Sequence, residues 1–81
     1  MTHQIIIGGT LNPNSLTINQ GDAVVWANNT ATVQDVSSND AGQTFTTGPI
    51  QPSADSLPIT VPSSTPYTVS PAGLAGNIDI T

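Results

Sequence analysis

Short runs of Ile, Val and Thr, separated at regular intervals by glycine or proline, limit what this chain can fold into more than any other feature. The chain contains 7 Gly and 7 Pro, and no window shows the 3.6-residue period of an amphipathic helix. Short β-branched runs bounded by turn-forming residues predict β-strands. The predicted strands are residues 3–7, 15–19, 23–28, 32–37, 44–48, 56–61, 66–69 and 76–81.

Several of these runs alternate apolar and polar residues, which places one set of side chains on a single face of the strand. Pro58 interrupts one alternating run and predicts an edge strand or a bulge, because proline has no backbone N–H to donate. The side chains expected to point mainly inward are Leu16, Ile18, Val24, Trp26, Leu57, Ile59, Val61, Tyr67, Ile78 and Ile80.

The number of strands and the chain length together restrict the architecture. Seven or eight short strands within 81 residues bury a core only as a two-sheet sandwich or a small barrel. The length also predicts a single domain that spans residues 1–81. The expected fold class is therefore all-β.

The ionisable side chains are unusually few, and they exclude several functions. The chain has no Cys, Lys, Arg or Glu, and its net charge is −5 with His3 neutral. Without Cys there is no thiolate nucleophile, redox pair, Cys-based zinc site or iron–sulfur cluster. Without Lys or Arg, binding to nucleic acid or to an anionic membrane surface is disfavoured. The charges come from Asp22, Asp35, Asp40, Asp55 and Asp79.

The location of the protein is constrained only by composition and by its first residues. No apolar run is long enough for membrane insertion as a helix, and "MTHQIII" has neither the basic region nor the apolar length of a signal peptide. The low charge and the many Thr and Asn residues favour an extracellular or periplasmic location.

Three stretches follow one another in an informative order. Residues 11–36 read "LNPNSLTINQGDAVVWANNTATVQDV", residues 45–50 read "FTTGPI", and residues 67–80 read "YTVSPAGLAGNIDI". The first contains Gly-Asp followed by a strand that ends in Trp-x-Asn, and the last joins an aromatic strand end to a Pro/Gly turn and a final strand. Over most of its length the chain resembles the cupredoxins, the plastocyanin-like blue-copper family. The resemblance implies a Greek-key β-sandwich of seven to eight strands.

The resemblance also implies where a copper ion would be held. Type-1 copper needs two imidazoles and one thiolate in a plane, with a weak axial thioether. The positions that resemble this ligand set, in the order His, Cys, His and Met, hold Gln34, Thr68, Pro71 and Leu74. None of these side chains offers a thiolate or an imidazole. The resemblance therefore implies a copper loop without its ligands, and we expect no metal and no other cofactor.

Other candidate sites have plainer interpretations. His3 with a terminal amine is a possible Cu(II) or Ni(II) chelate, but a lone imidazole on a mobile terminus is a poor site. Asp35 and Asp40 flank one loop, where capping of turns is the commoner use of Asp than catalysis. Residues 37–42, "SSNDAG", are too poor in oxygen ligands for a typical Ca²⁺ loop. An activated Ser or Thr nucleophile needs a base held beside it, and the sequence offers no such pair. An enzyme is therefore not expected.

These observations favour a non-catalytic, copper-free structural or binding module with an unknown protein partner. Self-association through strand edges is a second mode, because "HQIII" carries none of the charges that usually protect an edge. Two alternatives stay open: an electron-transfer or copper-handling protein with non-standard ligands, and an inactive scaffold derived from a copper protein. We expect the strand at residues 3–7 to be covered, either by its own sheet or by another copy.

Overall fold

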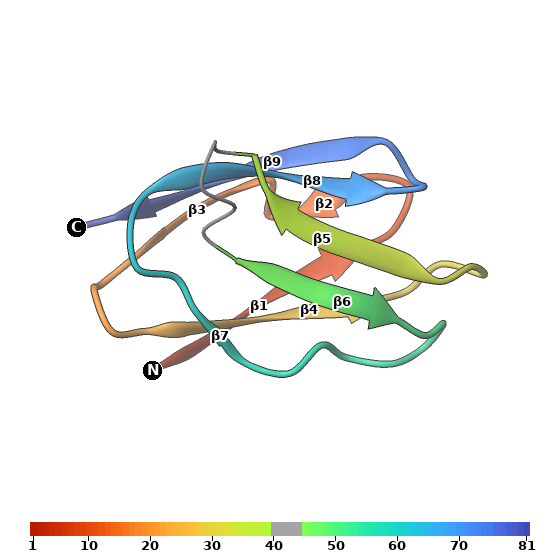
Figure 1. Ribbon diagram of the computed structural model, residues 1–81, viewed down its shortest axis with the longest axis horizontal. Helices are drawn as coiled ribbons and strands as arrows, with labels where there is room; N and C mark the ends of the chain where they lie inside the picture. The colour runs from red at the N-terminus through yellow and green to blue at the C-terminus, as the bar shows by residue number, and fades with distance from the viewer. Residues whose placement is uncertain (40–44) are drawn as a thin grey trace.

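The computed structural model describes residues 1–39 and 45–81, and these residues form nine strands in two facing sheets (Figure 1). The strands are β1 (Thr2–Ile7), β2 (Leu11–Asn12), β3 (Ser15–Ile18), β4 (Ala23–Asn28), β5 (Gln34–Ser38), β6 (Thr46–Ile50), β7 (Ile59–Thr60), β8 (Thr65–Ser70) and β9 (Leu74–Ile80). The all-β sandwich is confirmed. The strand missing from the sequence prediction is β2, which at two residues is too short to show alternation. Within the described ranges no helix is long and apolar enough to cross a membrane.

The chain passes back and forth between the two sheets. One sheet has the order β2-β1-β4-β7 and the other has the order β3-β9-β8-β5-β6. Strand β1 runs parallel to β4, and β3 runs parallel to β9, while the other neighbours are antiparallel. The N-terminal strand, predicted to be covered by its own sheet or by another copy, pairs along its whole length with β4 on one edge but with β2 only at Ile6 and Ile7 on the other, so its own sheet covers it in part.

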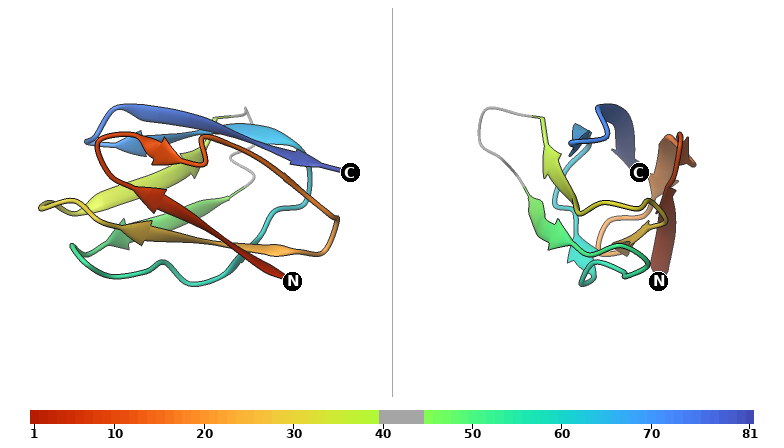
Figure 2. Two further views of the ribbon diagram at one scale, coloured as in Figure 1. Left: turned by 180° about the vertical axis from the view of Figure 1, so that it is seen from behind. Right: turned by 90° about the vertical axis from the view of Figure 1, so that its right-hand side faces the viewer.

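The core lies between the sheets, where alternate residues of each strand point inward. In the end-on view of Figure 2, β1 lies on one side of the sandwich and β5 and β6 lie on the other. The buried apolar residues are Ile5, Ile7, Leu11, Ile18, Val24, Trp26, Val36, Phe45, Ile50, Val61, Tyr67, Val69 and Ile78. Leu16, Ile59 and Ile80, also predicted to point inward, are partly buried against this core.

Leu57 is the one inward prediction that is wrong, because its side chain is 81% exposed. The reason is the backbone register along β4. Asp55 pairs with Ala27, and Ile59 pairs with Val24. Between these two pairs, residues 56–58 stand opposite only two residues of β4. Such a bulge breaks the period of two and turns a side chain to the other face. The prediction of an edge strand or bulge at Pro58 is confirmed, since β7 lies at the edge of its sheet.

The three aromatic side chains of the chain meet in one cluster in the core. The Trp26 and Phe45 rings stack with their centroids 5.3 Å apart. Trp26 and Tyr67 pack edge to face, with their ring centroids 5.5 Å apart. Both geometries are favourable for aromatic pairs. This cluster makes Trp26 a core residue, as its spacing with Val24 predicted.

Four loops gather at the end of the sandwich opposite the two chain termini (Figure 1). They are residues 8–10, 29–33, 51–53 and 71–73, which follow β1, β4, β6 and β8 in turn. We call this the loop end. Two of the stretches that resemble copper-binding segments, around Gln34 and around residues 71–74, belong to it.

Candidate functional site

Gln34 links two loops at the loop end. It is the first residue of β5 and only 2% exposed. Its amide nitrogen donates to the hydroxyl oxygens of Thr30 and Thr32, at 3.1 and 2.9 Å. Its amide oxygen accepts a hydrogen bond from the backbone N–H of Ala72, at 3.0 Å. The side chain therefore joins residues 30–32 to the turn between β8 and β9.

Asn28 forms a second buried amide beside it. It ends β4 and is 1% exposed. Its amide nitrogen donates to the carbonyl oxygens of Thr32 and Ile50, both at 2.8 Å. Its amide oxygen accepts from the backbone N–H of Thr30 at 3.0 Å, and the Thr30 hydroxyl lies 2.6 Å from it. Both donor hydrogens of each amide are thus used, which removes the penalty of burying them.

Together these groups make one network that fixes the loop end. We call it the amide network, and its members are Asn28, Thr30, Thr32, Gln34 and the backbone N–H of Ala72. Each hydrogen bond contributes about 0.5–1.5 kcal/mol net, and leaving one buried partner unpaired costs about 1–3 kcal/mol. The network therefore holds two loops, residues 29–33 and 71–73, in place with protein groups alone.

The four positions that resemble copper ligands do not all come together. Gln34 and Leu74 lie on the inner face of their sheet, Leu74 packing against the core. Thr68 lies between Tyr67 and Val69, which are both fully buried, so its side chain points to the outer face. Pro71 is exposed at the turn.

Val69 on β8 faces the same side of the sheet as Gln34, and Ala72 in the turn that follows contacts Gln34. Val69 pairs with Val36 on one side and Leu74 on the other, and all three therefore share the inner face with Gln34. The backbone N–H of Ala72 contacts Gln34 directly. Neither residue was singled out from the sequence as part of a site, and Thr32 was not singled out either. The polar run "NNTAT" at residues 28–32 is the signal that could have indicated hydrogen-bonding partners there.

The donor set at the loop end does not fit copper. Type-1 copper requires a thiolate and two imidazoles, whereas the groups that converge here are amides, hydroxyls and aliphatic side chains. The amide nitrogen of Gln34 already uses both hydrogens. Within residues 1–39 and 45–81, no three side chains of His, Cys, Asp or Glu lie close enough together to hold a metal ion. The assignment of Thr68 and Pro71 as former ligand positions stays a prediction from the resemblance.

His3 lies at the other end of the sandwich, where it contacts Asp22. The His3 Nε2 atom is 2.9 Å from Asp22 Oδ2, and the amine of Met1 is 3.2 Å from Asp22 Oδ1. The hydrogen bond from His3, followed by that from the amine, holds the pKa of Asp22 below its usual value of 3.8. The only imidazole of the chain therefore contacts Asp22 just before β4, at the end of the sandwich away from the amide network.

Asp35, the other acidic candidate, lies among hydroxyl groups on the outer face of β5. The hydroxyls of Ser37 and Thr46 lie 3.4 and 3.3 Å from Asp35 Oδ1. These groups tie β5 to the edge strand β6. Asp40, which flanks the same loop as Asp35 in the sequence, lies outside the described residues, as does half of the weak Ca²⁺ candidate at residues 37–42.

Comparisons with known proteins place the fold. No protein-family model matches the sequence, and neither does any curated protein sequence. Among solved structures, a purple cupredoxin from Nitrosopumilus maritimus superposes with a TM-score of 0.81 at 22% identity, covering 96% of this chain and 98% of that one. An amicyanin mutant in its Cu(I) form gives a TM-score of 0.81 at 14% identity, covering 96% and 80%. The chain therefore has the cupredoxin fold, as its sequence motifs predicted.

Proposed function

We propose that this protein is a non-catalytic, copper-free module of a single domain that works by binding a protein partner or by giving structural support. The observation that carries the proposal is the amide network. The Gln34 side chain joins the 30–32 loop to the turn at Ala72 through 3 hydrogen bonds. A loop end that is already fixed by protein groups needs no metal ion to order it.

The reactive side chains support a role other than catalysis. An activated nucleophile needs a base at hydrogen-bond distance and a third group that orients the base. The hydroxyl of Ser37 contacts Asp35, but the chain's single imidazole is paired with Asp22. A carboxylate alone is a weak base for a serine hydroxyl, whose proton it must remove at neutral pH.

The surface favours a protein partner over other classes. A net charge of −5 with no Lys or Arg opposes binding to nucleic acid. The composition favours an extracellular or periplasmic location. A module without cysteine does not depend on the redox conditions there for its stability. We retain self-association as a second mode, because β1 is paired with β2 only at Ile6 and Ile7.

A titration with Cu(II) tests the proposal. The expected result is no intense visible band, and no change in the amide NMR signals of Gln34 and Ala72, because no thiolate or imidazole lies at the loop end. The His3→Ala variant is the control, since it removes the only imidazole and isolates any binding near the amino terminus. An intense band in the wild type, or a reversible redox wave of bound copper, would show that the chain handles copper after all.

Light scattering tests the self-association mode. If two copies pair through the open part of β1, the Ile6→Lys variant should shift the particle toward the monomer, because it places a charge beside the contact. A wild type that stays monomeric at high protein concentration would remove this mode and leave binding to a different partner.

A further inference from the structure

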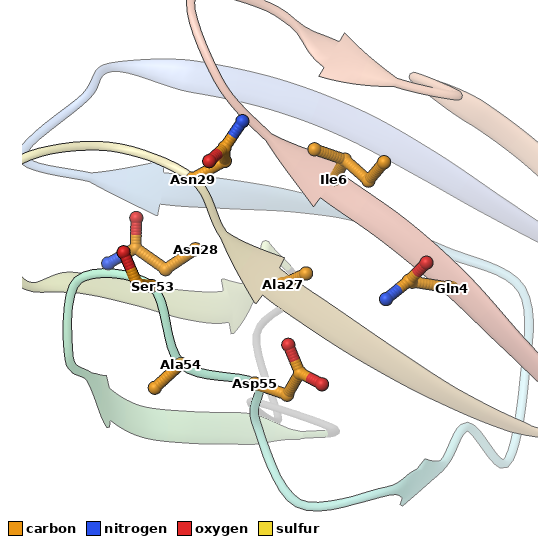
Figure 3. A pocket seen from close by; sticks show the side chains of 8 residues that line it. All are labelled: Gln4, Ile6, Ala27, Asn28, Asn29, Ser53, Ala54 and Asp55. Atoms are coloured by element: carbon orange, nitrogen blue, oxygen red, sulfur yellow. The ribbon is translucent and has the colours of Figure 1, made fainter.

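A shallow hollow of about 290 Å³ lies on the outer face of the four-stranded sheet. Its floor and walls come from β1, from the end of β4 and from the segment after β6 (Figure 3). The residues that matter for its chemistry are Gln4, Ile6, Ala27, Ser53 and Asp55. It adjoins the amide network at Asn28, which lines one side of it.

The backbone fixes the carboxylate of this hollow in place. Asp55 stands opposite Ala27 in an antiparallel bridge. On either side of it, the N–H of Asn28 donates to the carbonyl of Ala54, and the N–H of Ser56 donates to the carbonyl of Trp26, both at 2.8 Å. Asp55 is therefore carried by a segment that is hydrogen-bonded to a central strand, and not by a free loop.

The lining combines an apolar floor with polar groups at its rim. Ile6 is 39% exposed, a large exposure for an isoleucine in a strand, and the small side chain of Ala27 leaves space beside it. In Figure 3 the amide of Gln4 and the carboxylate of Asp55 lie on opposite sides of Ala27. A ligand that fits this lining has an aliphatic part for the floor and a hydrogen-bond donor for the rim.

The charge of that donor follows from the composition. Asp55 forms no ion pair with any residue of the described ranges. The chain has no Lys or Arg, and its two groups that can carry a positive charge, His3 and the terminal amine, are both held by Asp22. A second copy of the chain has the same deficit, so it cannot supply a cation to Asp55 either.

We propose that this hollow binds a basic side chain, arginine or lysine, from a partner protein. The aliphatic stem packs on Ile6 and Ala27, as such stems do on apolar surfaces. The charged head donates to the carboxylate of Asp55 and to the amide oxygen of Gln4, and a bond between charged groups is the stronger kind. The inference rests on the proposed function, because it names the partner's chemistry for a binding module.

An NMR titration with a short peptide, N-acetyl-Ala-Arg-Ala-amide, tests the inference on the intact chain. We expect shifts confined to Gln4, Ile6, Ala27 and residues 53–55, and none with the glutamine counterpart of the peptide. Asp55→Asn should weaken binding about ten-fold, which corresponds to the loss of about 1.4 kcal/mol. The matched control is Asp79→Asn, which removes the same charge from the other sheet and should leave binding nearly unchanged.

Three results would overturn the inference. Equal weakening by Asp55→Asn and Asp79→Asn would mean that only the net charge attracts the peptide. An absence of shifts would mean that the hollow takes no basic side chain. Shifts at these residues on raising the concentration of the protein alone would mean that a second copy covers the hollow. These three results come from the peptide titration and leave the proposed copper-free function intact. A visible band in the Cu(II) titration would remove that function without changing the peptide result.

Discussion

The ring of Tyr67 lies directly against Gly76 on the neighbouring strand, so close that a Cβ atom at position 76 would overlap the Cζ and hydroxyl oxygen atoms of the tyrosine. Gly76 belongs to the Gly-x-Ile ending of the final strand, and the contact gives a physical reason for glycine at this position. A side chain here would push Tyr67 into Trp26, which packs edge-to-face with it.

Gly76→Ala should therefore destabilise the protein by about 1–3 kcal/mol or more, the usual range for overpacking a core. Urea denaturation followed by tryptophan fluorescence measures this directly. Gly9→Ala is the control, because a Cβ atom at Gly9 meets nothing within 4 Å and its φ is not positive. A Gly76→Ala variant as stable as the wild type would show that the tyrosine ring has room to move.

Gln34→Met should also destabilise the protein, by about 1–3 kcal/mol. Methionine has a similar length but cannot hydrogen-bond to Thr30, Thr32 or Ala72, so the three hydrogen bonds of a buried side chain are lost. The comparison is Gln51→Met, which makes the same change at an exposed position and should have little effect. If both variants denature at the same urea concentration, the amide network contributes nothing to stability.

The strand pattern was the most predictable part of this protein. Period-two alternation reports which face a residue occupies, and it identified eight of the nine strands and the parts of the core that they contribute. Leu57 shows its limit. Alternation assumes a continuous register, and the extra residue opposite β4 is set by pairing between segments far apart in the sequence.

The candidate site was less predictable because it depends on contacts between loops. Gln34 was interpreted from the sequence as a lost metal ligand, and its link to Ala72 joins residues 38 positions apart. Thr68 and Val69 show how little separates two assignments. Moving by one residue along β8 exchanges the outer face for the inner one, and motif similarity alone does not fix the register.

The pH dependence of stability should contain a contribution from Asp22. Its pKa is lowered in the folded state, first by His3 and then by the amine of Met1. The folded state therefore holds this proton less tightly than the unfolded state, and the contribution is complete above the unfolded pKa near 3.8. It is lost as the pH falls through the folded value.

Thermal denaturation between about pH 2 and pH 6 checks this sign. Asp22→Asn should lower the melting temperature at pH 6 and flatten its fall below pH 4, while Asp79→Asn, which touches neither His3 nor the amine, should keep the wild-type slope. A steeper fall in Asp22→Asn than in the wild type would contradict the assignment.

The inner face of β8 can be tested by introducing copper ligands in two alternative sets. The first variant has His at 34, Cys at 69, His at 72 and Met at 74, and the second has His at 34, Cys at 68, His at 71 and Met at 74. We expect an intense visible copper–thiolate band only from the first variant, because Val69 shares the inner face with Gln34 whereas Thr68 points to the outer face. Visible absorption after adding one equivalent of Cu(II) measures the outcome.

Single cysteines separate the geometry from metal binding. In Thr68→Cys the thiol should react with a labelling reagent in the folded protein, and in Val69→Cys it should stay protected until urea is added, because Val69 is fully buried. Protection at 68 together with reaction at 69 would reverse the face assignment, and a copper band from the second set would do the same. Agreement of both measurements would place the position equivalent to the copper-ligating cysteine at Val69, one residue beyond the position that the sequence motif indicates.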